Sequence, residues 1–236
     1  MWFRRLRSKI IYDYAVIPFW LTLFGQIFAY YVTRVINSLL RGPVENYFDI
    51  STKLDNAIPL IPWWVSVYFL CYIFWVVGYI AVARQSKEIC FKMLMADFIS
   101  KILCSIIFIV FPTTLARPQL TDNSFFSSVV QLLYSIDRPD NLFPSMHCSV
   151  SWLTARYILK CNSIGRLNKF LSVVAAILVF FSVLFTKQHV IIDIFAGIAI
   201  VEISIVLSEK TGLYKLYDKL DCGKLIYERK KTVGRH

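Results

Sequence analysis

The chain has 236 residues, of which 57% are hydrophobic, 16% aromatic and only 17% charged. This composition excludes an ordinary soluble domain and indicates a protein embedded in a lipid bilayer. The formal net charge of +11 does not by itself indicate a nucleic-acid surface, because a membrane protein carries excess basic residues on its cytoplasmic side. We therefore expect the bilayer, and no nucleic acid, as a partner.

Six apolar segments approach or exceed the length of about 17–25 residues that a helix needs to cross a bilayer. In chain order they are residues 15–33, 56–83, 91–112, 144–159, 170–186 and 190–208. The fourth of them is short. No repeat or separate soluble domain interrupts the pattern, so the sequence predicts an all-α integral membrane protein with six transmembrane helices in one domain over residues 1–236.

Basic residues are distributed unevenly among the connections between these segments. The N-terminus, the second and fourth connections and the tail hold most of the 26 lysines and arginines. The other connections mix basic with acidic residues. The positive-inside rule then places both termini in the cytoplasm and the first, third and fifth connections outside. Residues 1–12 are expected to form an interfacial amphipathic segment, and residues 209–236 a basic cytoplasmic tail.

The six cysteines and three histidines do not have the spacing of a disulfide framework or of a zinc site. No cysteine lies in the long outer connections. The sequence therefore predicts no metal and no cofactor.

The third connection ends in a polar run that leads into the fourth apolar segment. The run is Asp140-Asn141-Leu142-Phe143-Pro144-Ser145-Met146-His147. Proline suits the first turn of a helix, where the free N–H groups and the Ser145 hydroxyl can bind an anion. A histidine at that position can protonate a phosphate leaving group. Taken alone, the motif also fits a capped helix with an incidental histidine.

Two arginines lie in the same connection. Arg117 follows the third apolar segment, and Arg138 lies six residues before Pro144. A guanidinium group is a natural fork for phosphate oxygens. The other interpretation of Arg117 is a residue that extends its charge from the bilayer edge into water.

The short connection between the fifth and sixth segments carries Lys187, His189 and Asp193. His189 and Asp193 are four residues apart and share one face of a helix. A carboxylate in that position can hold the imidazole tautomer and stabilise a charged ring. A purely structural pair at a helix start remains the alternative. The predicted topology places His189 on the same membrane face as His147 and Arg117.

Together, Arg117-Pro118, Pro144-Ser145-Met146-His147 and His189-x-x-x-Asp193 resemble the three signatures of the type 2 phosphatidic acid phosphatase superfamily. That family's pattern is K-x6-R-P, P-S-G-H and S-R-x5-H-x3-D, on a six-helix fold in its integral membrane members. The resemblance covers the third to sixth segments by motif and the whole chain by topology.

The resemblance implies a metal-independent phosphohydrolase with its site at the outer face. His189 would form a phosphohistidine, Asp193 would orient it, and His147 would be the general acid. Arg117 and Ser145 would bind phosphoryl oxygens, and phosphoryl transfer depends chiefly on such positioning and charge neutralisation.

The chain also departs from the family's pattern. Val110 and Val183 occupy the positions of a lysine and an arginine, and Met146 that of a glycine. Lys187 is the nearby cation that can replace the missing ones, and Arg138 is a weaker phosphate ligand. Lys187 at the bilayer edge can also be read as an interfacial lysine. The sequence around these motifs looks nearer the branch related to inositolphosphotransferases and sphingomyelin synthases.

Three functions follow as hypotheses. The first is hydrolysis of a lipid phosphate or diphosphate at the outer leaflet, with phosphatidate, phosphatidylglycerophosphate and undecaprenyl diphosphate as plausible substrates. The second is transfer of a phospho-headgroup to an acceptor hydroxyl. The third is a non-catalytic lipid transporter on the same fold, which would not need His147, His189 and Asp193.

Four charged residues lie inside the predicted spans: Asp97, Lys101, Arg156 and Glu202. Charges in a bilayer are costly and are usually paired or functional. We expect a structural network that joins the third, fourth and sixth spans; a polar path for substrate or protons is the alternative.

Overall fold

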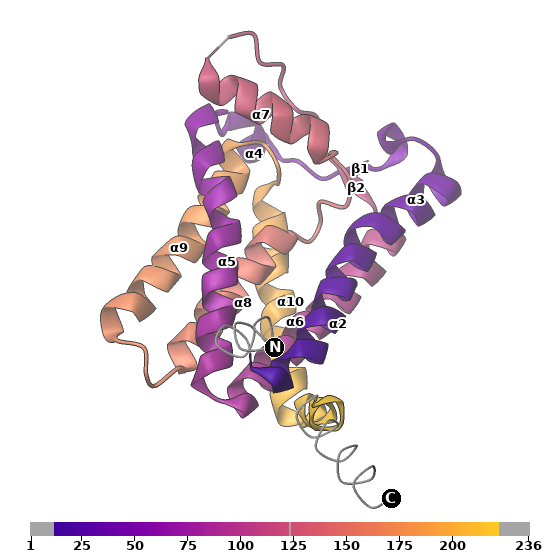
Figure 1. The fold of residues 1–236 in the computed structure, drawn as a ribbon. Helices are drawn as coiled ribbons and strands as arrows, with labels where there is room; N and C mark the ends of the chain where they lie inside the picture. The colour runs from indigo at the N-terminus through magenta and orange to yellow at the C-terminus, as the bar shows by residue number, and fades with distance from the viewer. Residues whose placement is uncertain (1–11, 123, 222–236) are drawn as a thin grey trace, which may run out of the picture.

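The computed structural model describes residues 12–122 and 124–221 (Figure 1). Almost all of the expected interfacial segment, and residues 222–236 of the expected tail, lie outside this range. Within it, most residues are helical, and the two short strands form one parallel pair. The prediction of an all-α protein is thus confirmed for the described residues.

Five helical segments of the described chain are long and apolar enough to span a membrane, as expected of a multi-pass membrane protein. The first is a rod made of η1 (Asp13–Ala15), α2 (Val16–Ile27), the π-helical turn η2 (Phe28–Val32) and α3 (Thr33–Arg41). The others are η4 with α5 (Pro62–Trp64, Val65–Gln85), α6 (Lys87–Val110), α9 (Arg166–Phe185) and α10 (Ile191–Lys210).

The fourth predicted span is the helix α8 (Met146–Lys160), which has 15 residues. At about 1.5 Å per residue it measures about 22 Å, which is less than the bilayer's hydrocarbon thickness of about 30 Å. It packs against α5, α6, α9 and α10, and Leu153, Ala155 and Tyr157 are fully buried. This short helix therefore lies at the centre of the bundle, where neighbouring helices surround it.

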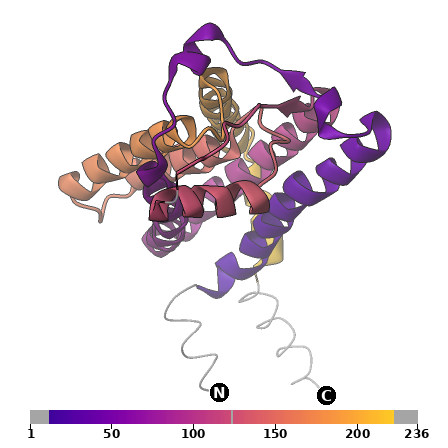
Figure 2. The same ribbon diagram turned by 90° about the horizontal axis from the view of Figure 1, so that it is seen from above.

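The short elements collect at one end of the bundle (Figure 1). They are η3 (Val44–Asn46), β1 (Phe48–Asp49), α4 (Lys53–Ala57), β2 (Thr113–Thr114) and α7 (Phe125–Ile136). The described chain begins with η1 and ends with η5 (Leu213–Leu220) at the opposite end. Seen from above, the α2–α3 rod and α9 lie on opposite sides of the molecule (Figure 2).

Two connections contain helices that the apolar pattern did not predict. The expected second span starts at residue 56, but a capping box of Thr52 and Asp55 forms α4 there. The spanning helix begins only at Pro62. The third connection contains α7, whose N-terminus is capped by Ser124.

The four charged residues of the spans form two separate pairs in the structure. The expected link between the fourth and sixth spans is confirmed, but the pair on the third span is joined to the second span and not to these two. Lys101 pairs with Asp97 on α6, and the Tyr79 hydroxyl of α5 donates to Asp97 at 2.6 Å. Arg156 of α8 pairs with Glu202 of α10, with 2.6 Å between Nε and Oε1. Each pair compensates its own charges and ties neighbouring helices together.

Candidate active site

The turn between α9 and α10 positions the residues of the third motif. The Gln188 amide donates to the Val183 carbonyl at 2.9 Å, and the Lys187 amide to the Leu184 carbonyl at 3.1 Å. These two bonds define a Schellman motif with Lys187 in the left-handed conformation, at φ +52°. The helix thus ends at Phe185, so Val183 and Lys187 do not lie one turn apart on a common helix face. Val183 itself is fully buried.

His189 and Asp193 form the pair that the sequence predicts. His189 Nδ1 lies 3.1 Å from Asp193 Oδ2, and the same oxygen accepts the Val190 amide at 3.0 Å. Because a carboxylate only accepts hydrogen bonds, this contact favours a proton on Nδ1, so that Nε2 carries the lone pair in the neutral imidazole. Asp193 is fully buried and His189 is 7% exposed, so the pair is fixed in orientation.

Asp55 of α4 reaches this turn from the first outer connection. Its Oδ1 accepts the Ile191 amide at 2.7 Å, and its main-chain oxygen accepts the Lys187 ammonium at 2.9 Å. Burial opposes ionisation, but hydrogen bonds from Thr52 and Ile191, with the nearby Lys187 charge, outweigh it and lower the pKa of Asp55. The carboxylate therefore caps the start of α10 and fixes the turn.

Arg117 is held from three directions. One terminal nitrogen donates to the Asp137 carbonyl and the other to Gln188 Oε1 at 2.6 Å. The guanidinium carbon lies 4.6 Å from the centre of the Tyr134 ring. Burial lowers the pKa of Arg117, although a guanidinium stays charged in proteins. Its Nε and the Gln188 Nε2 are buried without a protein partner.

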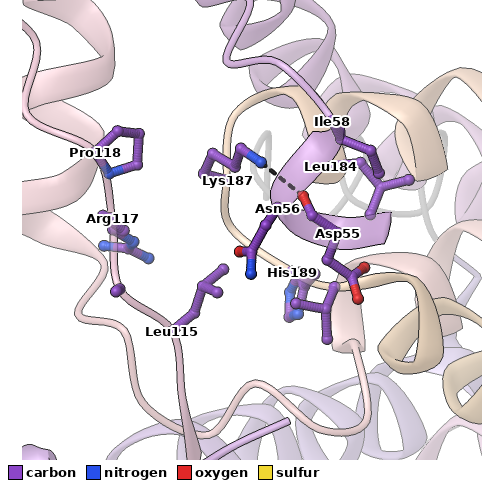
Figure 3. Close-up of a pocket in the computed structure, with 11 residues that line it drawn as sticks. Asp55, Asn56, Ile58, Leu115, Arg117, Pro118, Leu184, Lys187 and His189 are labelled. Atoms are coloured by element: carbon purple, nitrogen blue, oxygen red, sulfur yellow. Dashed lines mark hydrogen bonds between the residues drawn. The ribbon is translucent and has the colours of Figure 1, made fainter. Parts of the chain in front are cut away.

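Asp55, Arg117, Lys187 and His189 line one cavity of about 290 Å³ (Figure 3). Arg117 lies on one side, on the segment before α7, and Lys187 and His189 lie on the other. Burial lowers the pKa of Lys187, and within the described residues neither Arg117 nor Lys187 forms a salt bridge with a carboxylate. The Asp55 and Asp137 carboxylates act on these cations from beyond ion-pair contact. Two partly desolvated cations that are not in ion pairs make a site suited to an anion.

His147 lies beside this cavity in the first turn of α8. Its ring centroid is 5.8 Å from that of His189 and 4.7 Å from that of Tyr68. Its Nε2 lies 3.4 Å from the Tyr72 hydroxyl. The two imidazoles are close enough for one phosphoryl group to contact both, and aromatic rings cover His147 from the α5 side.

Two predicted phosphate ligands do not line the cavity. Ser145 is fully buried, and its Oγ accepts the Cys148 amide at 3.3 Å, as the N-cap of α8. Pro144 precedes that cap, so it is not in the first helical turn. Arg138 is exposed and absent from the cavity wall. The structure thus brings Arg117, Lys187, His189, Asp193 and His147 together and leaves Ser145 and Arg138 apart.

Sequence reasoning missed Asp55 and Gln188. Gln188 directly precedes His189, and a polar residue next to a candidate catalytic histidine was the signal that could have marked it as part of the site. Asp55 contacts Ile191 across 136 residues of sequence, and no local pattern marks such a contact. Among the described residues, no group of three His, Cys, Asp or Glu side chains could hold a metal ion.

Compared with protein-family models and with curated proteins, the sequence matches none. The motifs and the geometry of the cavity therefore carry the functional argument.

Because Asp55 caps α10 as a charged carboxylate, we expect the stability of the folded protein to depend on pH. A carboxylate whose pKa is lowered by folding stabilises the fold above its ordinary pKa of about 3.9, and this stabilisation is lost as pH falls through the lowered value. We expect Asp55→Asn to cost about 1 kcal/mol at neutral pH, or about 2–4 °C in Tm, because charge-assisted hydrogen bonds become neutral ones.

Thermal unfolding of the purified protein in detergent, measured across pH, checks this expectation. The gap between wild type and Asp55→Asn should narrow below about pH 4. Glu45→Gln, an exposed charge of the same connection, is the control and should leave Tm unchanged. A gap that stays constant with pH would show that the Asp55 charge is not what stabilises the turn.

Proposed function

We propose that the chain is a metal-independent lipid phosphate phosphatase of the type 2 phosphatidic acid phosphatase superfamily. The observation that carries the proposal is that Arg117, Lys187 and His189 line the same cavity, with the His147 ring centroid 5.8 Å from that of His189. Two cations, an oriented imidazole and a second imidazole are the parts that phosphoryl transfer through a covalent intermediate needs.

In the first step, His189 Nε2 attacks phosphorus and the N–P bond forms. The bond from phosphorus to the leaving oxygen breaks, and His147 gives that oxygen a proton. Asp193 keeps the proton on Nδ1 and stabilises the positive charge that develops on the attacking ring. Arg117 and Lys187 neutralise the charge on the phosphoryl oxygens.

In the second step, a water molecule gives a proton to His147, and the water oxygen attacks the phosphorus. The N–P bond breaks, inorganic phosphate leaves and His189 is free again. An acceptor hydroxyl in place of water would make the same chemistry a transfer, so hydrolase and phosphotransferase differ only in what enters the cavity at this point.

The proposal includes six crossings and a site on the outer face. Both ends of the described chain lie at one end of the bundle, which requires an even number of passes. The helix α4, which supplies Asp55 and Asn56 of the cavity wall, lies at the other end. The five long helices and the shorter α8 supply six. The positive-inside rule then places the cavity outside.

Phosphate release from a panel of lipid phosphates tests the function. Wild type should release inorganic phosphate from a lipid monophosphate or diphosphate without an alcohol acceptor, and EDTA should not reduce the rate. Turnover that requires the acceptor would favour the phosphotransferase. Loss of activity in EDTA that zinc or magnesium restores would contradict the metal-independent mechanism.

Lys187 is expected to act as a phosphate ligand. Lys187→Met should lower turnover by about tenfold or more, because the phosphate charge loses one of its two cations in a water-poor site. Steady-state kinetics measure the effect, with Lys53→Met on the neighbouring α4 as a matched loss of charge. Val183→Arg should not rescue the variant, because position 183 is in the core. Unchanged kinetics would show that Arg117 and the helix termini hold the phosphate alone.

Labelling of introduced cysteines tests sidedness. Asp122 is exposed before α7, and Lys215 is exposed in η5 at the opposite end. The five cysteines of the described chain are buried, so they give little background. Asp122→Cys should react with an impermeant thiol reagent in intact cells, and Lys215→Cys only after lysis. The reverse labelling pattern would show that the cavity faces the cytoplasm and would contradict the proposed orientation.

A further inference from the structure

A second cavity, of about 370 Å³, runs along α5 on the side that faces the α2–α3 rod. Its walls come from α2 (Phe19, Leu23), α5 (Tyr72, Val76) and α6 (Leu94). Val76 is 60% exposed and Leu23 is 37% exposed, so the cavity is a groove that opens sideways between helices. We call it the lateral groove.

Two aromatic residues in the wall of the lateral groove, Tyr72 and Trp75, contact His147 of the candidate active site. The Tyr72 hydroxyl lies 3.4 Å from Nε2, and the Trp75 ring centroid lies 5.7 Å from that of the imidazole. From Tyr72 the groove continues along α5 to Ala83, which is about 16 Å at the rise of an α-helix.

We propose that the lateral groove holds one hydrocarbon chain of the substrate lipid, whose phosphate lies in the Arg117–Lys187–His189 cavity; this inference rests on the proposed function. The groove walls belong to helices that are apolar enough to lie in the bilayer, where the surrounding medium is lipid chains. A chain that enters sideways would place its headgroup end at His147.

The charged residues in the groove wall do not offer a second phosphate site. Lys101 pairs with Asp97 of the same helix, and Tyr79 donates to that carboxylate at 2.6 Å. Lys101 and Asp97 are 4% and 1% exposed, so their charges are compensated within the wall. The phosphate is therefore directed to Arg117 and Lys187, and the groove is left to the chain.

The groove acts through position and not through hydrophobic attraction. A hydrocarbon chain gains little by leaving the bilayer for a protein surface, because lipid chains are as apolar as leucine. A chain held in one track nevertheless fixes where its headgroup lies, and misplacement of a reacting group by about 1 Å can cost about 10²-fold in rate. The groove should thus affect long-chain substrates and leave short, water-soluble phosphate esters unaffected.

Two adjacent valines of α5 provide a matched test. Val76 lines the groove and Val77 is not among its lining residues, and each is 60% exposed. We expect Val76→Trp to lower kcat/KM for a long-chain phosphatidate at least about tenfold. Its kcat/KM for p-nitrophenyl phosphate should stay within about twofold of wild type. Val77→Trp should stay within about twofold of wild type in kcat/KM for both substrates. Leu23→Trp, on the opposite wall, should reproduce the Val76→Trp result.

A readout without turnover separates this inference from the proposed function. A phosphatidate with a diazirine on its chain should label the groove walls on α2, α5 and α6, also in His189→Ala, and Val76→Trp should reduce the labelling. Three results would overturn the groove assignment. They are equal kinetics in Val76→Trp and Val77→Trp, equal losses of Val76→Trp on phosphatidate and p-nitrophenyl phosphate, and labels outside the groove walls. Wild type that releases no phosphate while the groove is labelled would overturn the function alone.

Discussion

Substitution of His189 by alanine is expected to remove turnover almost completely, by more than about 10⁴-fold, because the nucleophile of the proposed mechanism is lost. The fold should persist, since Asp193 keeps the hydrogen bond from the Val190 amide at 3.0 Å. Phosphate release and thermal unfolding of the same preparation measure the two effects. Capture of phosphorylated protein from a labelled substrate should succeed with wild type and fail with the variant.

His147→Ala is the comparison that separates the two imidazoles. A general acid contributes about 10²–10⁴-fold, and less when the leaving group needs no proton. The loss should therefore be severe with an alkyl phosphate and smaller with p-nitrophenyl phosphate, whereas His189→Ala should be inactive on both. His189→Ala with more than about a hundredth of the wild-type rate would contradict the covalent role.

The spanning helices were predictable because a bilayer demands one simple pattern. Runs of apolar residues long enough to cross it are visible in any window of sequence, and α6, α9 and α10 lie within a few residues of the predicted segments. The helix α7 was not predicted. Its 12 residues are too few for a span, and they lie in a connection that the length argument treats as loop.

The motifs identified His147, His189, Asp193 and Arg117, but not how the chain holds them. Lys187 itself adopts the left-handed conformation that ends α9, and glycine is the residue usually found there. The position of the α10 N-terminus depends on Asp55, which is far away in sequence. Contacts of this kind follow from the packing of the outer connections, and a single sequence carries no local signal for them.

The Ser145 hydroxyl shows the limit of transferring a role by motif. As a residue in the polar run it was a candidate phosphate ligand. In the structure it caps α8, and its amide donates to the Asp193 carbonyl at 3.1 Å. Ser145 thus links the start of α8 to the start of α10, which brings His147 and His189 together without contact with the cavity.

Arg117→Lys should lower turnover by about 10²-fold although it keeps the positive charge. The guanidinium reaches the Asp137 carbonyl and Gln188 Oε1 at the same time, and its Nε is left without a protein partner. A lysine ammonium is a point charge on a flexible stem and cannot reproduce this planar fork. The loss should appear mainly in kcat, because the fork is expected to match the phosphoryl oxygens best in the transition state.

Arg138→Lys is the matched control, since Arg138 lies in the same connection but is exposed and outside the cavity wall. Its kinetics should stay within about twofold of wild type, because the substitution keeps the positive charge and the exposed Arg138 side chain is not part of the cavity wall. Comparable losses in the two variants would mean that an arginine-to-lysine change anywhere in this connection disturbs the site, so that the effect at Arg117 is not specific to its contacts. Wild-type kinetics in Arg117→Lys would mean that charge near His189 is sufficient, so that the geometry of the fork does not contribute to phosphoryl transfer.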